Sequence, residues 1–294
     1  MRWTEESLAA AKTMNDSRQV KERQERLYVL APRKKPSPSE DDFLEVAYDY
    51  RRAREFQPSR HYYRKVIRSN QFSFPDRVRA YHGFRMTYKN ERDLDSYLDA
   101  TEELGRFVEY WFKKNPSSFM LRSSLHDTLV TLARTYWTLD HYSKGYKTLD
   151  KLERHLKGRH SLHKVYWLTG RMREERGHYK EAVSWFNQSL QEFGDHSEAR
   201  EEVLWFKAWN QRKLGNKDSA LDALSELKLK TTSDYARAKF SFWLAKTFQD
   251  MGDEVRAHME FEDLIRQDPL GYYGLLAHHE IGRRITFKSE AVDR

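Results

Sequence analysis

Histidine and carboxylate side chains are the groups in this sequence that could ligate a metal or carry acid–base catalysis. Two groups of such residues stand out: His155, His160 and His163, and His278, His279 and Glu280. Zinc ligands on a helix need i, i+4 spacing and a further partner, whereas the first group has steps of 5 and 3. Neighbouring His278 and His279 point about 100° apart on a helix. We therefore expect neither a metal nor a cofactor.

No arrangement typical of a catalytic centre is distinguishable. Glycoside cleavage needs two carboxyl groups across a cleft. The chain has 45 acidic residues, and no pair of them is singled out by its position. We interpret Glu260 and Glu262, for example, as solvated charges on a helix surface. The sequence contains no GxxxxGK[ST] phosphate loop and no GxSxG elbow. It has no cysteine, which excludes thiolate chemistry and disulfides. We name no catalytic residue and leave open whether the chain is part of an enzyme.

The balance of charge points to anionic partners. The net charge is +8, and basic and aromatic residues alternate between Tyr50 and Arg68. Such a stretch could contact a polyanion, and the candidate contacts are Arg51, Arg52, Arg64, Lys65 and Arg68. Nucleic acid is the weaker choice of polyanion, because no known nucleic-acid-binding module is visible. The alternative is a solvated helix face with Tyr63 and Val66 in the core.

A repeat organises the second half of the chain. Asp140, Gly177, Gly215 and Gly252 follow one another at steps of 37, 38 and 37 residues. Each has a small residue seven positions earlier, a small residue five positions later and a large apolar residue nine positions later. In that order these companions are Ala133, Gly170, Ala208 and Ala245; Gly145, Ala182, Ala220 and Ala257; and Leu149, Phe186, Leu224 and Phe261. A fixed period of this length is typical of stacked repeats.

Each repeat predicts two helices joined by a tight turn, with small residues where the helices cross. The pattern is similar to the tetratricopeptide repeat, although its step is longer than the usual ~34 residues. We expect an all-α, right-handed α-superhelix of about six helix pairs, the first two irregular, with Arg54 and Asn90 at their turns. An additional helix over 104–114 would fill the long gap before Asp140. We expect the tryptophans to pack between repeats, with sugar stacking as the alternative.

Three regions follow from these patterns. Residues 1–40 are expected to form a lead-in helix and a Pro/Ser linker, 41–284 the solenoid, and 285–294 a tail or truncated linker. No apolar run approaches the ~20 residues of a membrane-spanning helix. Residues 1–14 lack the apolar core of a secretory signal.

The segment from Asp268 to Arg284 resembles the end of the superhelix in Slt-type soluble lytic murein transglycosylases. The matching residues are Pro269, Tyr272, Tyr273, Gly274, Leu276, Ala277, Ile281 and Gly282. In that family the superhelix precedes a lysozyme-like catalytic domain with Glu-Ser and Gly-Leu-Met-Gln motifs. Neither motif occurs here, so the resemblance implies a substrate-guiding module without an active site.

The resemblance also implies where such a module works and what it contacts. It implies a periplasmic protein with peptidoglycan or a catalytic lysozyme-like domain as partner. If Met1 is the native start, a cytoplasmic location is expected instead. Candidate contacts to a neighbouring domain are Tyr272, Tyr273, Arg283 and Arg284. The alternative function is a free-standing tetratricopeptide-like adaptor that binds partner proteins.

Overall fold

The computed structural model describes residues 42–192 and 198–285, and within these ranges the chain is helical and contains no strand. This confirms the all-α fold. The thirteen helices of these ranges are α3 (Phe43–Arg52), α4 (Phe56–Arg68), α5 (Phe74–Glu91), α6 (Leu94–Lys114), α7 (Phe119–Thr138), α8 (Tyr142–Leu156), α9 (His163–Glu175), α10 (Tyr179–Gln191), α11 (Glu198–Lys213), α12 (Lys217–Lys230), α13 (Asp234–Asp250), α14 (Glu254–Gln267) and α15 (Tyr272–Glu280).

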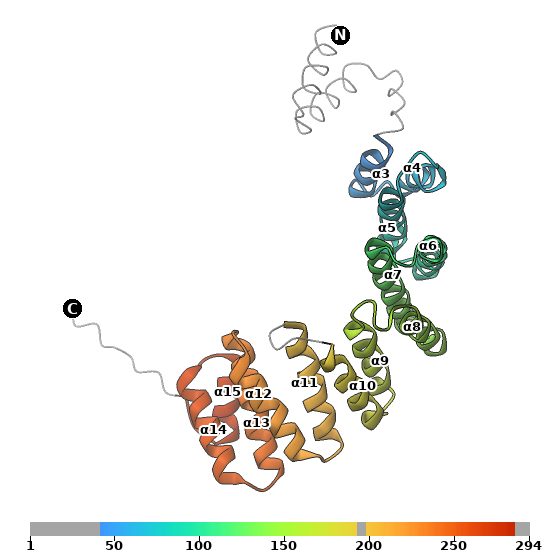
Figure 1. Ribbon diagram of the computed structural model, residues 1–294. Coiled ribbons are helices and arrows are strands. Elements are labelled where there is room, and N and C mark those ends of the chain that lie inside the picture. The colour runs from blue at the N-terminus through green and yellow to red at the C-terminus, as the bar shows by residue number, and fades with distance from the viewer. Residues whose placement is uncertain (1–41, 193–197, 286–294) are drawn as a thin grey trace, which may run out of the picture. The chain divides into compact units, whose positions relative to one another are not determined.

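The chain divides into two compact units, and the boundary between Tyr97 and Leu98 falls inside α6. The first unit holds α3, α4, α5 and the start of α6. The second holds the rest of α6 and all later helices. From α9 to α15, each helix of this unit lies antiparallel to the one before it (Figure 1). In both units the helices form consecutive pairs. We call the first helix of each pair its A-helix and the second its B-helix, so that α15 is a further A-helix.

Every A-helix is followed, one or two positions after its last residue, by a residue with left-handed backbone. These residues are Arg54, Arg92, Asp140, Gly177, Gly215, Gly252 and Gly282, with φ between 59° and 81°. The next residue then donates its N–H to a carbonyl five positions back, as His178 does to Arg173 at 3.0 Å. This bond satisfies a carbonyl that the end of the helix leaves free, and it reverses the chain. Glycine adopts this conformation without a steric penalty, which explains its recurrence at the turn.

Two predictions about the first pairs are wrong. The left-handed residue after α5 is Arg92 and not Asn90, which lies within the helix. No additional helix over 104–114 exists, because these residues belong to the single 21-residue helix α6. The long gap before Asp140 arises because α5, α6 and α7 have 18, 21 and 20 residues. Within residues 42–192 and 198–285, α3 to α14 form six consecutive pairs, as predicted.

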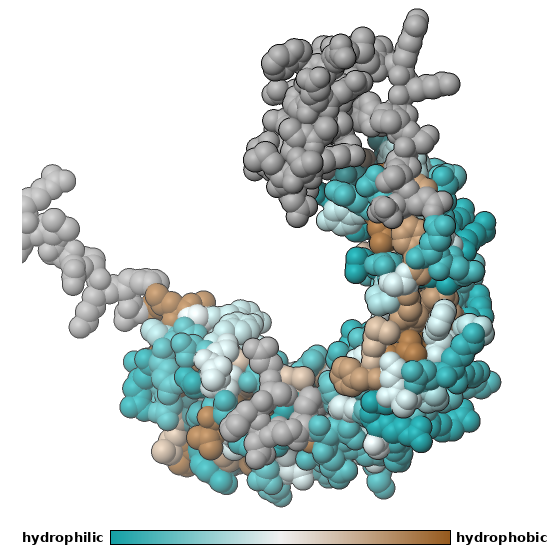
Figure 2. Space-filling model, turned by 45° about the horizontal axis from the view of Figure 1, so that its top comes forward, coloured by the Kyte–Doolittle hydropathy of each residue, from teal (hydrophilic) through white to brown (hydrophobic). Residues whose placement is uncertain are grey.

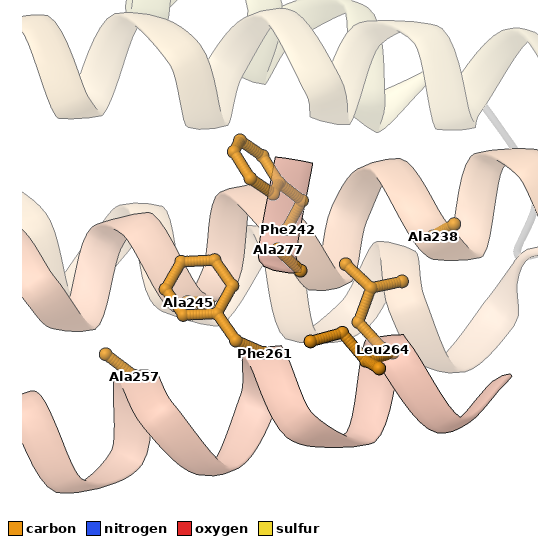
Figure 3. Close-up of a cluster of buried hydrophobic side chains, with 8 residues drawn as sticks. Ala238, Phe242, Ala245, Ala257, Phe261, Leu264 and Ala277 are labelled. Carbon is orange, nitrogen blue, oxygen red and sulfur yellow. The ribbon is translucent and has the colours of Figure 1, made fainter. Parts of the chain in front are cut away.

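The small residues do lie at close helix crossings. Ala208, Ala220, Ala245 and Ala257 are at most 1% exposed. At the end of the stack, the ring of Phe242 of α13 lies 5.7 Å from that of Phe261 of α14, in the same cluster as Ala245 and Ala257 (Figure 3). A larger side chain at such a crossing would meet a neighbouring ring and force the helices apart. The second pair differs, since Arg85 and Tyr97 stand at its crossing positions and the Arg85 guanidinium donates to the Tyr97 hydroxyl at 2.6 Å.

The structure does not test most of what was predicted for the two ends of the chain. The expected lead-in (1–40) and all of the expected tail except Ile285 lie outside the described residues. The last helix of the described residues, α15, ends at Glu280. Within the described ranges, no helix combines the length and the apolar character that crossing a membrane requires.

Candidate functional site: an aromatic and cationic A-helix face

Aromatic and cationic side chains contact one another across neighbouring A-helices of the second unit. We call this surface the A-helix face. Its members are Arg134 of α7, Trp167 and Arg171 of α9, Trp205, Phe206, Trp209 and Arg212 of α11, and Lys239 and Trp243 of α13. Three pairs within these helices are four positions apart and so project from one side of their helix. They are Trp167 and Arg171, Trp205 and Trp209, and Lys239 and Trp243.

The rings link one A-helix to the next. The Trp167 ring of α9 lies 6.4 Å from Phe206 of α11. Further along, Trp243 of α13 lies 6.3 Å from Trp205 and 4.8 Å from Trp209, both on α11, in edge-on arrangements. Such edge-to-face pairs are favourable because the positive edge of one ring meets the negative face of another. The four indoles are only partly buried, so this surface keeps aromatic area accessible.

Cations lie over several of these rings. Arg171 lies 3.7 Å from the centroid of Phe206, and Lys239 lies 3.5 Å from that of Trp205. Arg134 lies 5.1 Å from the centroid of Trp167. Each contact is a cation–π interaction, worth roughly 0.5–2 kcal/mol depending on its desolvation. Burial lowers the pKa of the Lys239 ammonium, and the charge of Glu201 opposes this effect only in part.

The cations of the A-helix face differ in their counter-charges. Arg171 is paired with Glu174, and Arg212 with Asp250. Arg134 and Lys239, by contrast, have no carboxylate of the described residues within ion-pair distance, although the charge of Glu201 acts on Lys239 from further away. The indole N–H of Trp167 is buried and has no acceptor there. A ligand that combines apolar groups with carboxylates would therefore find ring surface and two cations without an ion-pair partner on one face.

The polyanion candidates lie elsewhere, in the first unit. Arg51 and Arg52 end α3, while Arg64, Lys65 and Arg68 lie on the exposed side of α4. Arg64 lies over Phe84 at 5.0 Å and Lys65 over Phe43 at 4.8 Å.

One arginine of the same basic stretch is buried within the first unit and contributes to its packing. Arg60 is buried, and its guanidinium contacts Glu91 at 2.5 Å. Tyr63 and Val66 are in the core, as the alternative interpretation of this stretch supposed. The contact of the five candidates with a polyanion stays a prediction.

The domain-contact candidates lie at both ends of α15, with Tyr272 and Tyr273 at its start and Arg283 and Arg284 after its last residue. Tyr272 is 62% exposed, whereas Tyr273 is half-buried and its ring lies 5.7 Å from Phe242. Arg283 forms an ion pair with Glu262 of α14 at 2.8 Å, and Arg284 is exposed. Tyr272 and Arg284 are thus accessible, while the other two already have partners within the chain. Their contact with another domain remains a prediction.

The histidines do not form a metal site in the described part of the chain, where no group of three or more histidines and carboxylates has suitable geometry. His126 of α7 and His160 lie with their rings 4.9 Å apart. Burial is the main cause that lowers the pKa of nearby His163 to about 4. Burial thus disfavours the charged form of His163.

Sequence reasoning overlooked the A-helix face. Its signal was present, because Trp167 and Arg171, and Trp205 and Trp209, are each separated by four residues. The pattern alone places such residues on one side of a helix. It does not say whether that side is covered by the next repeat.

Comparisons with known proteins agree with this architecture. No protein-family model and no curated protein matches the chain. Among solved structures it is similar to PilW, a widely conserved type IV pilus biogenesis factor, at 11% identity over 82% of this chain and 99% of that one, with a TM-score of 0.52. A putative kinesin light chain from Podosopora anserina with TPR-like repeats is 17% identical over 67% and 97%, with a TM-score of 0.52. The Pseudomonas aeruginosa pilF structure has 12% identity over 82% and 97%, with a TM-score of 0.50.

At these identities the likeness concerns the fold. Together with the paired helices and their repeated left-handed turns, it defines a class of protein. The chain is a tetratricopeptide-like, all-helical repeat protein.

Proposed function

We propose that this protein is an interaction scaffold whose A-helix face binds a segment of a partner protein. The observation that carries this proposal is the position of Arg134 and Lys239, two cations held over indole rings with no carboxylate of the described residues within ion-pair distance. Tetratricopeptide-like solenoids bury their apolar faces between repeats and leave an extended surface for partners. The partner segment would carry acidic residues next to apolar ones.

The energetics favour such a segment. Trp167, Trp205 and Trp243 already contact neighbouring rings, so little side-chain freedom is left to lose on binding. A carboxylate beside Lys239 would favour its charged form and offset the effect of burial on its pKa. Indole and guanidinium groups are the side chains that most often dominate binding energy at protein interfaces.

The test measures binding of two synthetic peptides to the full chain by fluorescence anisotropy. Both have twelve residues, one with alternating Leu and Glu and one with alternating Leu and Lys. We expect the Glu peptide to bind at least tenfold more tightly than the Lys peptide. The double variant Arg134→Met and Lys239→Met should abolish that preference, while Lys180→Met, on the exposed side of α10, should leave it intact. Equal affinities of the two peptides would refute the proposal.

The alternative function, a substrate-guiding module of a peptidoglycan lytic transglycosylase, rests on the residues of α15 and its preceding turn. The comparisons give it no support. Part of its motif has a local structural reason, because a Cβ at Gly274 would overlap the Asp268 carbonyl oxygen.

Under this alternative, the partner would be peptidoglycan or a catalytic lysozyme-like domain, and the location would be the periplasm. Sedimentation of the chain with insoluble sacculi at low salt tests it. A chain that stays wholly in the supernatant rejects wall binding.

A further inference from the structure

A depression of about 440 Å³ lies between α14 and the end of α15. Its walls include Val255, Met259 and Ile281, and Ala257 and Phe261, both buried, form its apolar base. The polar residues around it are Gln249, Glu254, His258 and Glu280. We call this the end surface. It belongs to the second unit and is separate from the A-helix face.

Two exposed apolar residues of the end surface stand at positions where other repeats have polar residues. Val255 and Met259 lie three and seven positions after the left-handed turn residue, and they are 73% and 61% exposed. The equivalent positions in the three preceding B-helices are Ser143 and Lys147, Lys180 and Ser184, and Asp218 and Asp222. All six are exposed and polar or charged. Two exposed apolar side chains in their place at α14 therefore indicate a local function.

The turn after α15 has the geometry that leads into a B-helix elsewhere. Gly282 is left-handed with φ of 64°, and the N–H of Arg283 reaches the carbonyl of His278 at 2.9 Å. The six earlier turns have the same bond, and each is followed by a B-helix that packs on its A-helix. The end surface thus lies where a seventh B-helix would begin.

The residues that follow this turn do not carry the pattern of a B-helix. Five positions after Gly282 stands Phe287, where the three preceding pairs have alanine. Nine positions after it stands Ala291, where those pairs have Phe186, Leu224 and Phe261. Seven positions before it, Leu275 takes the place of a glycine or alanine. Large side chains at both crossing positions are incompatible with the close approach of the pairs from α9 to α14, although the second pair, with Arg85 and Tyr97, forms without small residues there.

The charge of the end surface defines the chemistry of what could cover it. Glu254 makes no ion pair within the described residues, whereas Glu280 is paired with Lys246 at 3.0 Å. An unpaired carboxylate next to an apolar depression suits a helix with one apolar face and a basic flank.

We propose that the end surface binds a helix of a partner protein in the place of a seventh B-helix. Leucine-like side chains of that helix enter the depression beside Val255 and Met259, and a lysine or arginine meets Glu254. This inference goes beyond the adaptor function, because it concerns a second surface with a preference for basic and not acidic partners.

The experiment measures binding of two labelled helical peptides to the full chain. Both are sixteen-residue alanine-based helices with leucines at i, i+4 and i+7, flanked by lysines in one and by glutamates in the other. We expect the lysine peptide to bind at least tenfold more tightly. The double variant Val255→Ser and Met259→Lys installs the residues of α8 and should reduce binding at least tenfold with unchanged circular dichroism. Glu254→Gln should reduce the preference for lysine.

Two matched controls isolate the surface. Leu229→Ser removes another highly exposed apolar side chain, on α12, and should change nothing. Arg134→Met with Lys239→Met should also leave this binding intact, so failure of the A-helix face and failure of the end surface are distinguishable.

Four results would overturn the proposal. The lysine peptide does not bind, or it binds the Val255→Ser, Met259→Lys variant as well as the original chain. Sedimentation shows self-association of the full chain that this variant abolishes, so that a second copy is the occupant. Binding appears only after residues 286–294 are deleted, so that the chain's own segment is the occupant.

Discussion

Two substitutions at equivalent left-handed turn positions are predicted to change the stability of their helix pairs in opposite directions. Gly177 ends α9 with φ of 78°, and Arg92 ends α5 with φ of 64°. We expect Gly177→Ala to destabilise its helix pair and Arg92→Gly to stabilise its own. The turn, and not the surrounding packing, would cause both effects.

The magnitude follows from the local geometry at Gly177. A Cβ built there has no atom within 4 Å, so the substitution creates no clash with neighbouring residues. The left-handed conformation costs an L-residue about 1–2 kcal/mol. The reduced freedom of alanine in the unfolded chain returns about 0.4–1 kcal/mol. The net loss for Gly177→Ala is therefore about 1 kcal/mol, and the net gain for Arg92→Gly is about 0.5–1 kcal/mol by the same reasoning.

Hydrogen exchange read by mass spectrometry is the suitable assay, because repeats open locally and not always as one unit. Amides of α9 and α10 should lose about fivefold protection in Gly177→Ala, the factor that corresponds to about 1 kcal/mol. Gly177→Asn is the matched control, since asparagine tolerates left-handed backbone and should retain most of the protection. Equal losses for alanine and asparagine would refute the conformational explanation.

Three further predictions concern single side chains. Phe186→Ala removes a fully buried ring and should lower the free energy of unfolding by about 3–5 kcal/mol in urea titrations; Phe186→Leu should cost clearly less. Gly274→Ala would place its Cβ against the Asp268 carbonyl oxygen, so α15 should lose its exchange protection while α9 keeps it. His163 has its pKa lowered by burial to about 4, so the unfolded chain binds a proton more readily than the folded one. Stability from this group is full above about pH 6.5 and is lost as the pH falls towards 4. We expect about 1 kcal/mol less stability at pH 5 than at pH 7.5, after allowing for solvent screening, and His163→Gln should remove that part of the dependence.

The repeat architecture could be predicted from the sequence because it depends on local and periodic requirements. A turn that needs left-handed backbone selects glycine or aspartate, and a close crossing selects alanine or glycine at fixed offsets from it. Gly177 and Gly215 therefore gave the correct turns. Asn90 did not, because asparagine can adopt the turn conformation without being required to, and Arg92 is the residue that adopts it here.

The candidate surfaces depended on information that periodicity does not contain. Trp167 and Trp205 could be assigned to one side of a helix from their spacing, but their partial exposure follows from how far the next A-helix covers them. The unpaired state of Lys239 depends on which carboxylates of neighbouring helices reach it. Val255 and Met259 could be compared with the polar residues of other repeats, whereas only the packed end of α14 and α15 forms the depression beside them.

The amino-acid sequence by itself thus determined the helix pairs, their turns and the small residues at most of their crossings, since each of these is set by the conformational limits of a few nearby residues. The tertiary structure decided which tryptophans stay accessible, which cations lack a counter-charge and where the stack exposes an apolar surface. These properties arise from contacts between side chains some 30 to 40 residues apart, such as Lys246 and Glu280, and no local rule of spacing specifies them.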